Sequence, residues 1–350
     1  MKVLFLPVNI ASMQPITCKE MNNISGVDAR CIIDQNTLMV SSNENVLIIP
    51  RSSRKNILFS ILNTFIYFFK IKKWIKWADV LHYVYTPGDK FNRDLAYAHK
   101  LGKKIFVEFV GSDIRIPELL SEINPYYKHA YYNEEYEYKH VEKNNNNLKL
   151  QKVFSNFKAT PIVNPEMQLF LNQGLFPKFH QVYFRINVHD FIPLYPKVNN
   201  QKPIIIHSPS ALIAKGSNII LQIVDRLKFS HDFEFILIHK KPRKEVLELL
   251  KNADIFIDQI ILGTYAMAAM EAMSYGKPTL CYIMPQVYQN GLPKECPVVN
   301  VNPDTLEEKL IELIENPKLR HNIGLKSREF VEKYHNAGQL AFELQKIYSQ

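Results

Sequence analysis

The sequence predicts an α/β protein of two domains, each built on a parallel sheet. At 350 residues the chain is long enough to form two hydrophobic cores. Short apolar runs alternate with amphipathic stretches along the chain, as they do in strand–helix–strand units. The clearest unit is 254–283, DIFIDQIILGTYAMAAMEAMSYGKPTLCYI, which predicts a strand, a tight loop, a helix and a second strand.

The first domain is expected to span residues 1–190. Its predicted strands are Lys2–Val8, Cys31–Ile33, Val46–Ile49, Asp79–Tyr85 and Lys104–Val110, with a helix at Asn92–Leu101 that ends at Gly102. Farther along we expect an exposed helix and loop at Tyr126–Asn147, a strand at Val153–Phe154, a helix within Pro161–Gly174 and a strand at Val182–Arg185.

The proline-rich stretch Asp190–Pro203 is the expected linker, and the second domain is expected to span 203–334. Its predicted strands are Ile204–Ile206, Phe233–His239, Asp254–Ile261, Thr279–Ile283 and Pro297–Val301. The predicted helices begin near Asn218 and cover Pro242–Lys251, Tyr265–Tyr275, Thr305–Asn316 and Pro317–Tyr334, and residues 335–350 carry a last helix at Ala337–Ser349.

Glu271 is unusual because it lies in the apolar helix AMAAMEAM. An ionised carboxylate there is costly unless something pairs with it. Helical spacing puts Glu271 on the side of Thr264, the expected N-cap, where it could accept hydrogen bonds from the hydroxyls of a ribose. The amides of Gly263 and Thr264 suit a phosphate or a sugar oxygen. A solvent-facing glutamate on a short helix is the alternative.

A second candidate loop is Gly111–Arg115, GSDIR, which follows the strand Lys104–Val110. Ligand loops of α/β proteins lie at the carboxyl ends of strands. Gly111 and Ser112 would let the backbone approach a ligand, while Asp113 and Arg115 supply charge. The alternative is a helix cap with a surface ion pair.

A third candidate is Lys215 with Gly216, just before the helix that begins near Asn218. A lysine beside the free amides of a helix N-terminus suits a diphosphate. A solvated loop lysine is the alternative. Four cysteines without close spacing indicate neither a disulfide framework nor a metal site.

The formal net charge of +9 indicates an anionic partner, such as a nucleotide diphosphate, phospholipid headgroups or nucleic acid. No helix-turn-helix, zinc or RNA-binding signature accompanies it, so nucleic acid is not the expected partner. Met1–Val8 has the pattern of a strand and not of a signal peptide, which predicts a cytoplasmic protein.

The stretch Arg51–Trp77 has the most one-sided charge, since it carries lysines and arginines but no Asp or Glu. Its apolar run, ILFSILNTFIYFFKI, is too short and too polar to span a bilayer. Aromatic residues and lysines at its margin are typical of a helix that lies in a membrane interface. A helix that packs on the sheet with solvated lysines is the alternative, and both can be partly true.

The segment GTYAMAAMEAMSYGKPTLCY resembles the nucleotide-sugar segment of family-four glycosyltransferases. The resemblance implies the GT-B fold, in which two Rossmann-like domains face each other across a cleft and the last helix crosses back to the first domain. In that family a Glu matching Glu271 binds the donor ribose. A second Glu, eight positions earlier, binds the donor sugar, and Gly263 stands there in this chain.

The resemblance extends to the other candidates. GSDIR lies on the cleft side in many such enzymes, and a Lys-Gly matching Lys215 and Gly216 contacts the donor phosphates. An Arg usually stands at the position of Ser210, and His239 falls where base contacts occur. The predicted catalytic residues are Asp113 and Lys215. The predicted donor-binding residues are Glu271, Gly263, Thr264, Tyr265, Lys215, Gly216, Ser210 and His239, and Gly111, Ser112 and Arg115 are predicted on the acceptor side.

The expected function is hexosyl transfer from a nucleotide-diphosphate sugar, without metal or cofactor, to a glycan, lipid-linked or polymer acceptor in surface polysaccharide or glycoconjugate synthesis. A basic helix at Arg51–Trp77 would fit such an acceptor at the inner face of the membrane. The alternatives are a nucleotide-sugar epimerase or hydrolase of the same fold, or a non-catalytic sugar-nucleotide-binding protein.

Overall fold

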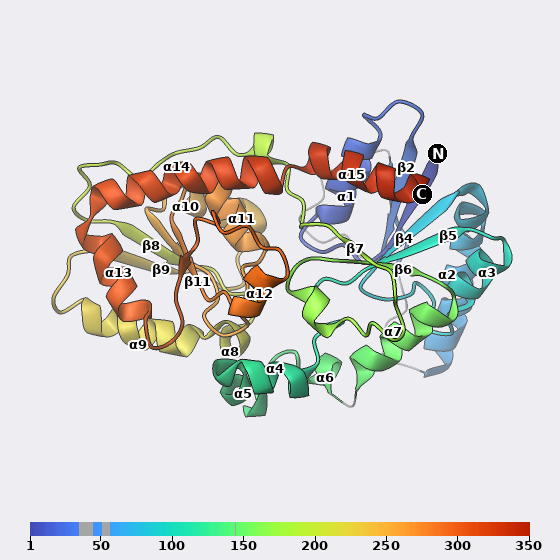
Figure 1. Cartoon of the computed structure of the whole chain (residues 1–350), viewed down its shortest axis with the longest axis horizontal. Coiled ribbons are helices and arrows are strands. Elements are labelled where there is room, and N and C mark those ends of the chain that lie inside the picture. The colour runs from blue at the N-terminus through green and yellow to red at the C-terminus, as the bar shows by residue number, and fades with distance from the viewer. Residues whose placement is uncertain (35–44, 51–56, 144) are drawn as a thin grey trace. The chain divides into compact units, whose positions relative to one another are not determined.

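The computed structural model describes residues 1–34, 45–50, 57–143 and 145–350 (Figure 1). The chain forms two compact units, each with its own sheet. Unit 1 comprises residues 1–115, 144–185 and 337–350, and unit 2 comprises residues 116–143 and 186–336. Both sheets are parallel, so the α/β prediction is confirmed.

Unit 1 contains a seven-stranded sheet in the order β3-β2-β1-β4-β5-β6-β7. Figure 1 shows α1 and α15 on one face of this sheet and α2, α3 and α7 on the other. The strands are β1 Lys2–Pro7, β2 Asp28–Ile33, β3 Val46–Ile48, β4 Val80–Val84, β5 Lys104–Glu108, β6 Thr160–Val163 and β7 His180–Gln181. The helices are α1 Met13–Met21, α2 Ile57–Trp77, α3 Arg93–Lys100, α7 Asn146–Asn156 and α15 Ala337–Ser349, with a short 3-10 turn at Met167–Phe170.

Three predicted elements of this region were wrong. Val153–Phe154 is not a strand but part of α7, because Asn147, Gln151 and Phe154 bury one helical face. The helix predicted within Pro161–Gly174 is only a 3-10 turn, and the start of that segment belongs to β6, which pairs with β5. The last strand lies at His180–Gln181 and not at Val182–Arg185.

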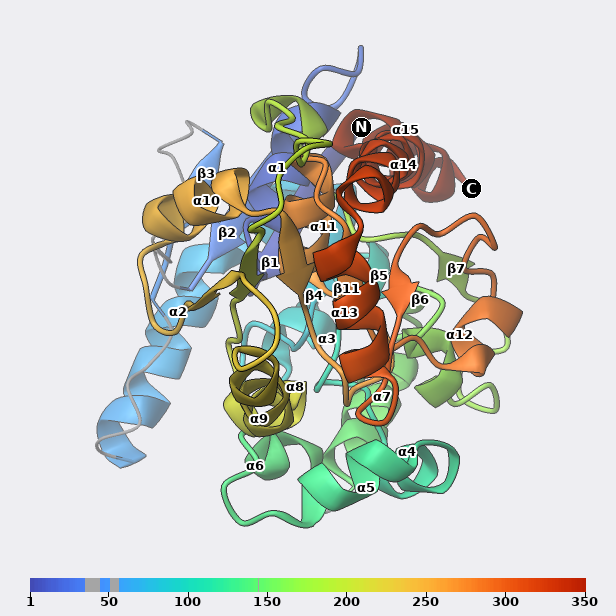
Figure 2. The same cartoon turned by 90° about the vertical axis from the view of Figure 1, so that its left-hand side faces the viewer.

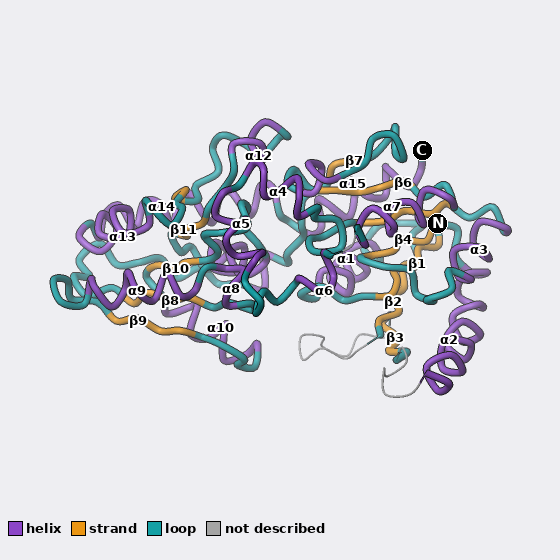
Figure 3. Tube along the Cα trace, turned by 90° about the horizontal axis from the view of Figure 1, so that it is seen from below, coloured by secondary structure: helices purple, strands orange, loops and turns teal. Residues whose placement is uncertain are grey.

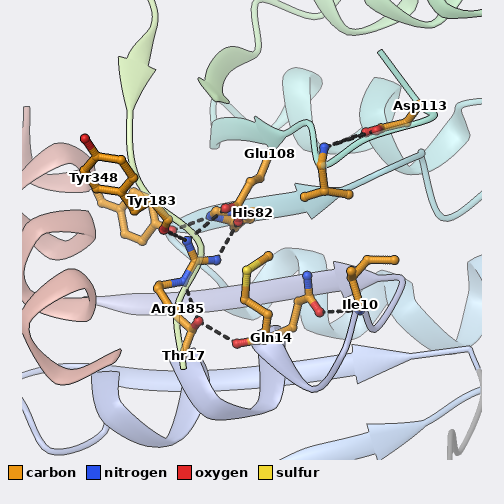
Figure 4. Close-up of polar contacts among 11 residues, drawn as sticks. Ile10, Gln14, Thr17, His82, Glu108, Asp113, Tyr183, Arg185 and Tyr348 are labelled. Atoms are coloured by element: carbon orange, nitrogen blue, oxygen red, sulfur yellow. Dashed lines mark hydrogen bonds and ion pairs between the residues drawn. The ribbon is translucent and has the colours of Figure 1, made fainter. Parts of the chain in front are cut away.

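A buried polar network connects the core of unit 1 to its last helix (Figure 4). Arg185 donates two hydrogen bonds to Glu108, at 2.8 and 2.6 Å, and a third to the Thr17 hydroxyl at 2.8 Å. His82 lies between Glu108, whose carboxylate is 3.0 Å away, and the hydroxyl of Tyr348 on α15. The network therefore holds β4, β5, α1 and α15 together.

Unit 2 contains a five-stranded sheet in the order β12-β11-β10-β8-β9. In Figure 1, α10, α11 and α14 lie on one face of this sheet and α9 and α13 on the other. The strands are β8 Ile204–His207, β9 Glu234–Leu237, β10 Ile255–Ile257, β11 Thr279–Cys281 and β12 Val299–Asn300. The helices are α4 Pro117–Ile123, α5 Pro125–Tyr132, α6 Lys139–Glu142, α8 Leu212–Lys215, α9 Ser217–Leu227, α10 Arg243–Asn252, α11 Met267–Ser274, α12 Pro285–Gln289, α13 Leu306–Glu315 and α14 Pro317–Tyr334, and a 3-10 turn lies at Val188–Asp190.

Two segments group with unit 2 although the sequence placed them elsewhere. Residues 116–143, assigned to the first domain, belong to unit 2, where the Asn124 amide donates to the carbonyl of Ile261 at 2.7 Å. The expected linker Asp190–Pro203 packs on α11 and α14. The guanidinium of Arg328 donates to the carbonyl of Phe191 at 2.8 Å, and the amide of Leu194 donates to the carbonyl of Tyr275 at 3.0 Å.

Glu108→Gln is expected to destabilise unit 1 by about 3–5 kcal/mol, because it leaves the Arg185 guanidinium buried without its counter-charge. Burial acts to raise the pKa of Glu108, but Arg185 and His82 outweigh it and lower the pKa from 4.5 to about 2. The carboxylate therefore contributes stability above pH 4.5, and this contribution is lost as the pH falls toward 2.

Both tryptophans of the chain, Trp74 and Trp77, lie in unit 1, so their fluorescence during urea unfolding measures this change. The exposed Glu134→Gln is the control and should leave the transition in place. Equal urea midpoints for the two variants would contradict the proposed contribution of the buried pair.

Candidate active site

The winding of the unit 2 sheet reverses between β8 and β10. If the strands of the unit are renumbered 1 to 5 along the chain, their order in the sheet, starting from β9, is 2-1-3-4-5. The chain therefore adds β9 on one side of β8 and the later strands on the other side. Ligands of such sheets bind at the carboxyl ends of the strands where the winding reverses. The loops after β8 and β10 carry Lys215 and Asp258, respectively, and meet at this point.

Lys215 and Asp258 form a buried ion pair between these two loops. The Lys215 ammonium lies 2.8 Å from Asp258 Oδ1, and both side chains are almost fully buried. Burial acts to lower the pKa of Lys215, but Asp258 outweighs it and raises the pKa above its usual value. One of the three ammonium N–H groups is used by Asp258, so the charge is held in place while other donors remain for a ligand.

The second oxygen of Asp258 fixes the start of α11. It accepts a hydrogen bond from the amide of Ala266, the N-cap residue, at 3.0 Å. The prediction that Thr264 is the N-cap is therefore wrong, and α11 begins at Met267. Sequence reasoning missed Asp258, although an aspartate after the apolar run IFI is the kind of interruption that marks a strand end.

Glu271 lies on the second turn of α11 and is buried, with 5% of its surface exposed. This contradicts the solvent-facing alternative. Its carboxylate forms an ion pair with the guanidinium of Arg243, the first residue of α10. Burial raises the pKa of Glu271, and Arg243 opposes that shift. The rule that a buried carboxylate requires a partner anticipated such a cation but did not identify Arg243.

Gly263 has a backbone that only glycine adopts readily, with φ +97°. A Cβ atom built there would lie 2.5 Å from Cγ of Met284, and the Met284 amide donates to the Gly263 carbonyl at 2.9 Å. A side chain at this position would have to displace Met284 and would strain the backbone. The packing of this loop against Met284 therefore accounts for a glycine where the family pattern has a glutamate.

The other predicted donor residues are spread around the same edge. Ser210 is exposed, and His239 is half-buried with Nδ1 3.2 Å from the carbonyl of Pro209. The hydroxyl of Tyr265 lies 2.9 Å from Nε2 of His335, so this side chain packs toward the end of α14. Gly216, with φ +79°, leaves no room for a Cβ beside Ile260.

The amides before Lys215 already have an acceptor. The carboxylate of Glu137 accepts from the amides of Ile213 at 3.0 Å and Ala214 at 3.1 Å. The amides expected beside Lys215 were those of the helix near Asn218, which is α9, so this contact in α8 leaves that expectation a prediction. No signal in the sequence indicated Glu137, because the contact joins residues 76 positions apart.

A cavity of about 540 Å³ lies beside these loops, between α5 and the α8–α9 turn. Gly216 and Ile261 form part of its wall, and the rest is mostly apolar. Tyr126 and Asp304 border it and hydrogen-bond to each other at 2.6 Å, which raises the pKa of Tyr126 to about 12. Among the described residues that line it, Lys215, Glu271 and His239 are absent.

The GSDIR loop of unit 1 is a compact turn. Asp113 is buried, and its carboxylate accepts from the amides of Val110 at 3.1 Å and Gly111 at 2.6 Å. Burial raises the pKa of Asp113 to about 7. The Ser112 hydroxyl lies 2.8 Å from that of Tyr85.

The remaining charge of the loop, Arg115, is also engaged within unit 1. Its guanidinium lies 3.5 Å from the carboxylate of Glu166, and both side chains are buried. The sequence left a surface ion pair as one alternative for this loop, and the burial of both side chains contradicts it.

Gly263→Ala is expected to destabilise the protein by about 1–3 kcal/mol, from the strained φ and the contact with Met284. In a Met284→Ala background the same substitution should cost less, because the contact is gone and the strain remains. Scanning calorimetry measures both changes. Gly111→Ala is the control, since its Cβ meets nothing within 4 Å, and an equal loss there would contradict the geometry.

Comparisons with known proteins agree with this architecture. Residues 224–330 match the family described as Glycosyl transferases group 1. No curated protein sequence matches the chain. Sucrose-phosphate synthase from Thermosynechococcus elongatus has a similar structure, with a TM-score of 0.67 at 11% identity, over 100% of this chain and 98% of that one.

Two further solved structures are similar over almost their full lengths. Anabaena HepE in complex with UDP and glucose has a TM-score of 0.61 at 11% identity, covering 100% of this chain and 99% of that chain. WaaG, a glycosyltransferase involved in lipopolysaccharide biosynthesis, has a TM-score of 0.56 at 12% identity, covering 99% of each chain. The protein therefore has the GT-B fold of two Rossmann-like domains, and its residues 224–330 carry the pattern of glycosyl transferases group 1.

Proposed function

We propose that this protein is a glycosyltransferase that moves a hexosyl group from a nucleotide-diphosphate sugar to an acceptor. The observation that carries the proposal is the buried carboxylate of Glu271 at the ligand edge of unit 2, within the segment that matches the family. HepE, which has a similar fold, was solved with UDP and glucose, and this supports a nucleotide-sugar donor.

We assign each part of the donor to a different group of residues in unit 2. Glu271 would accept the ribose hydroxyls, sharing its charge with Arg243. Lys215, held by Asp258, would stabilise the negative charge that develops on the leaving diphosphate. The amides of Gly263 and Thr264 would add two donors at a phosphate or sugar oxygen. With this positive charge supplied by the protein, we propose that transfer needs no metal ion and no cofactor.

The acceptor side is assigned to the GSDIR loop. Because the Asp113 carboxylate is engaged by the amides of its own turn, we assign it the role of holding Gly111 and Ser112 in position. A glycan, lipid-linked or polymer acceptor in surface polysaccharide or glycoconjugate synthesis fits the involvement of WaaG in lipopolysaccharide biosynthesis. The proposed location is cytoplasmic, at the inner face of the membrane.

A non-catalytic sugar-nucleotide-binding protein is the second candidate, favoured by the absence of any room for a carboxylate at position 263. A nucleotide-sugar epimerase or hydrolase is the third. Turnover of the donor separates the three: transfer requires an acceptor, hydrolysis or epimerisation proceeds without one, and a binding protein leaves the donor intact.

Nucleotide binding tests the site before any acceptor is known. Calorimetry with UDP-, GDP-, ADP- and CMP-sugars identifies the base, and the matching nucleoside and nucleoside diphosphate are then compared. Glu271→Gln should weaken both ligands by about tenfold or more, because it weakens a hydrogen bond to the ribose. Lys215→Met should weaken only the diphosphate, because the nucleoside has no phosphate.

Matched controls are Glu329→Gln and Lys326→Met, two exposed positions of α14. They should bind both ligands like the unmodified protein. If no nucleotide binds, or if Glu271→Gln binds as tightly as its control, the assignment of the donor site is wrong.

A further inference from the structure

Helix α2 has two apolar faces, of which only one is covered. Tyr67, Ile71 and Ile75 are buried and pack against the sheet and α3. This is the packing helix that the sequence left as one alternative. A helix needs only one apolar face to pack in this way, so apolar residues on its other face require a separate explanation.

The second face of α2 exposes large apolar side chains. Leu62, Phe65, Ile66 and Phe69 recur every three or four residues, and Phe69 is 65% exposed. Figures 2 and 3 show that the amino-terminal part of α2 extends beyond the other elements of unit 1. Single exposed apolar residues are ordinary, but a continuous row marks an interaction surface.

A hollow of about 580 Å³ adjoins this face. Its apolar wall is formed on the α2 side by Ile66, Phe69 and Trp74. On the other side it is formed by Leu47 of β3 and by Ile49, which follows that strand. Lys70 and Lys73 also line it, so two ammonium groups stand beside an apolar surface.

The charge of α2 has one sign. The helix carries Lys70, Lys72, Lys73 and Lys76 and no acidic residue. In the described parts of the chain none of these lysines pairs with a carboxylate. Arg51, Arg54 and Lys55, which the sequence analysis grouped with this helix, lie outside the described residues.

A bilayer surface is the partner that matches both properties. Its phosphates meet the ammonium groups, and the acyl region just beneath them takes apolar side chains. Lysine side chains can reach the phosphates while their methylene stems lie along the apolar boundary. No helix among the described residues is long and apolar enough to cross a membrane, so the surface would lie on the bilayer.

We propose that the exposed face of α2 (Leu62, Phe65, Ile66, Phe69, Lys70 and Lys73) docks the protein on an anionic membrane. Leu62, Phe65 and Phe69 enter the interface, and Lys70 and Lys73 bind lipid phosphate at the hollow. This inference extends the proposed function, which places the enzyme at a membrane, and it identifies the surface and the lipid charge that are responsible.

Vesicle flotation tests the proposal with the full chain. Vesicles of phosphatidylcholine are compared with vesicles that contain about 30 mol% phosphatidylglycerol, which supply the anionic surface. The protein should float with the anionic vesicles, and high salt should reduce binding. Phe69→Asp should lower the bound fraction severalfold, because it puts a carboxylate where an aromatic ring enters the interface. Phe229→Asp is the matched control, since Phe229 is 93% exposed in unit 2.

The lysines are tested separately. Lys70→Gln/Lys73→Gln should weaken binding to anionic vesicles by about fivefold per lysine, and Lys318→Gln/Lys326→Gln on α14 should not change it. The urea transition of Trp74 and Trp77 fluorescence shows whether unit 1 of Phe69→Asp is folded, because both tryptophans lie in that unit. Nucleotide calorimetry on the same variant reports on the donor site proposed in unit 2. It also separates this inference from the proposed function, since either can fail while the other holds.

Three results would overturn the proposal. One is the absence of binding to anionic vesicles. Another is equal binding by Phe69→Asp and Phe229→Asp. The third is a dimer of the unmodified protein, seen by light scattering, that Phe69→Asp converts to monomer, because a second copy of the chain would then cover this face.

Discussion

The carboxylate of Asp258 organises the ligand edge of unit 2. One oxygen holds the ammonium of Lys215 and the other accepts from the amide of Ala266, the residue before α11, so a single side chain fixes the loops after β8 and β10. The amide of Ile260 donates to the carbonyl of Lys215 at 3.2 Å and joins the same two loops through the backbone. The positions of the proposed donor-binding groups therefore depend on Asp258 before any ligand arrives.

Buried charge in this protein serves two purposes that look alike locally. Glu108 with Arg185 in unit 1 and Asp258 with Lys215 in unit 2 are both buried pairs, in which the pKa of Glu108 is lowered and that of Lys215 is raised. The first pair lies inside the core beneath α15, whereas the second lies where the sheet winding reverses. The topology, and not the pKa shift, marks the second pair as the candidate binding site.

Periodicity predicted most strands, the parallel sheets and the last helix, because these depend on local patterns of apolar residues. It also identified Glu271 as a charge that requires a partner. The contacts of Arg243 and Glu137, and the grouping of 116–143 with unit 2, join residues far apart in the chain, so no local pattern indicates them. Thr264 was mistaken for an N-cap because β10 ends four residues earlier than its isoleucine run suggested.

The glycine at position 263 shows how two loops jointly shape the sugar end of the proposed site. Met284, which follows β11, occupies the space that a side chain at 263 would need, and its amide binds the Gly263 carbonyl. Restoring an acidic residue at 263 alone would therefore create a clash and backbone strain together. It follows that any group replacing the missing carboxylate must come from another loop, and that Gly263 and Met284 have to be considered as one unit when the donor sugar is sought.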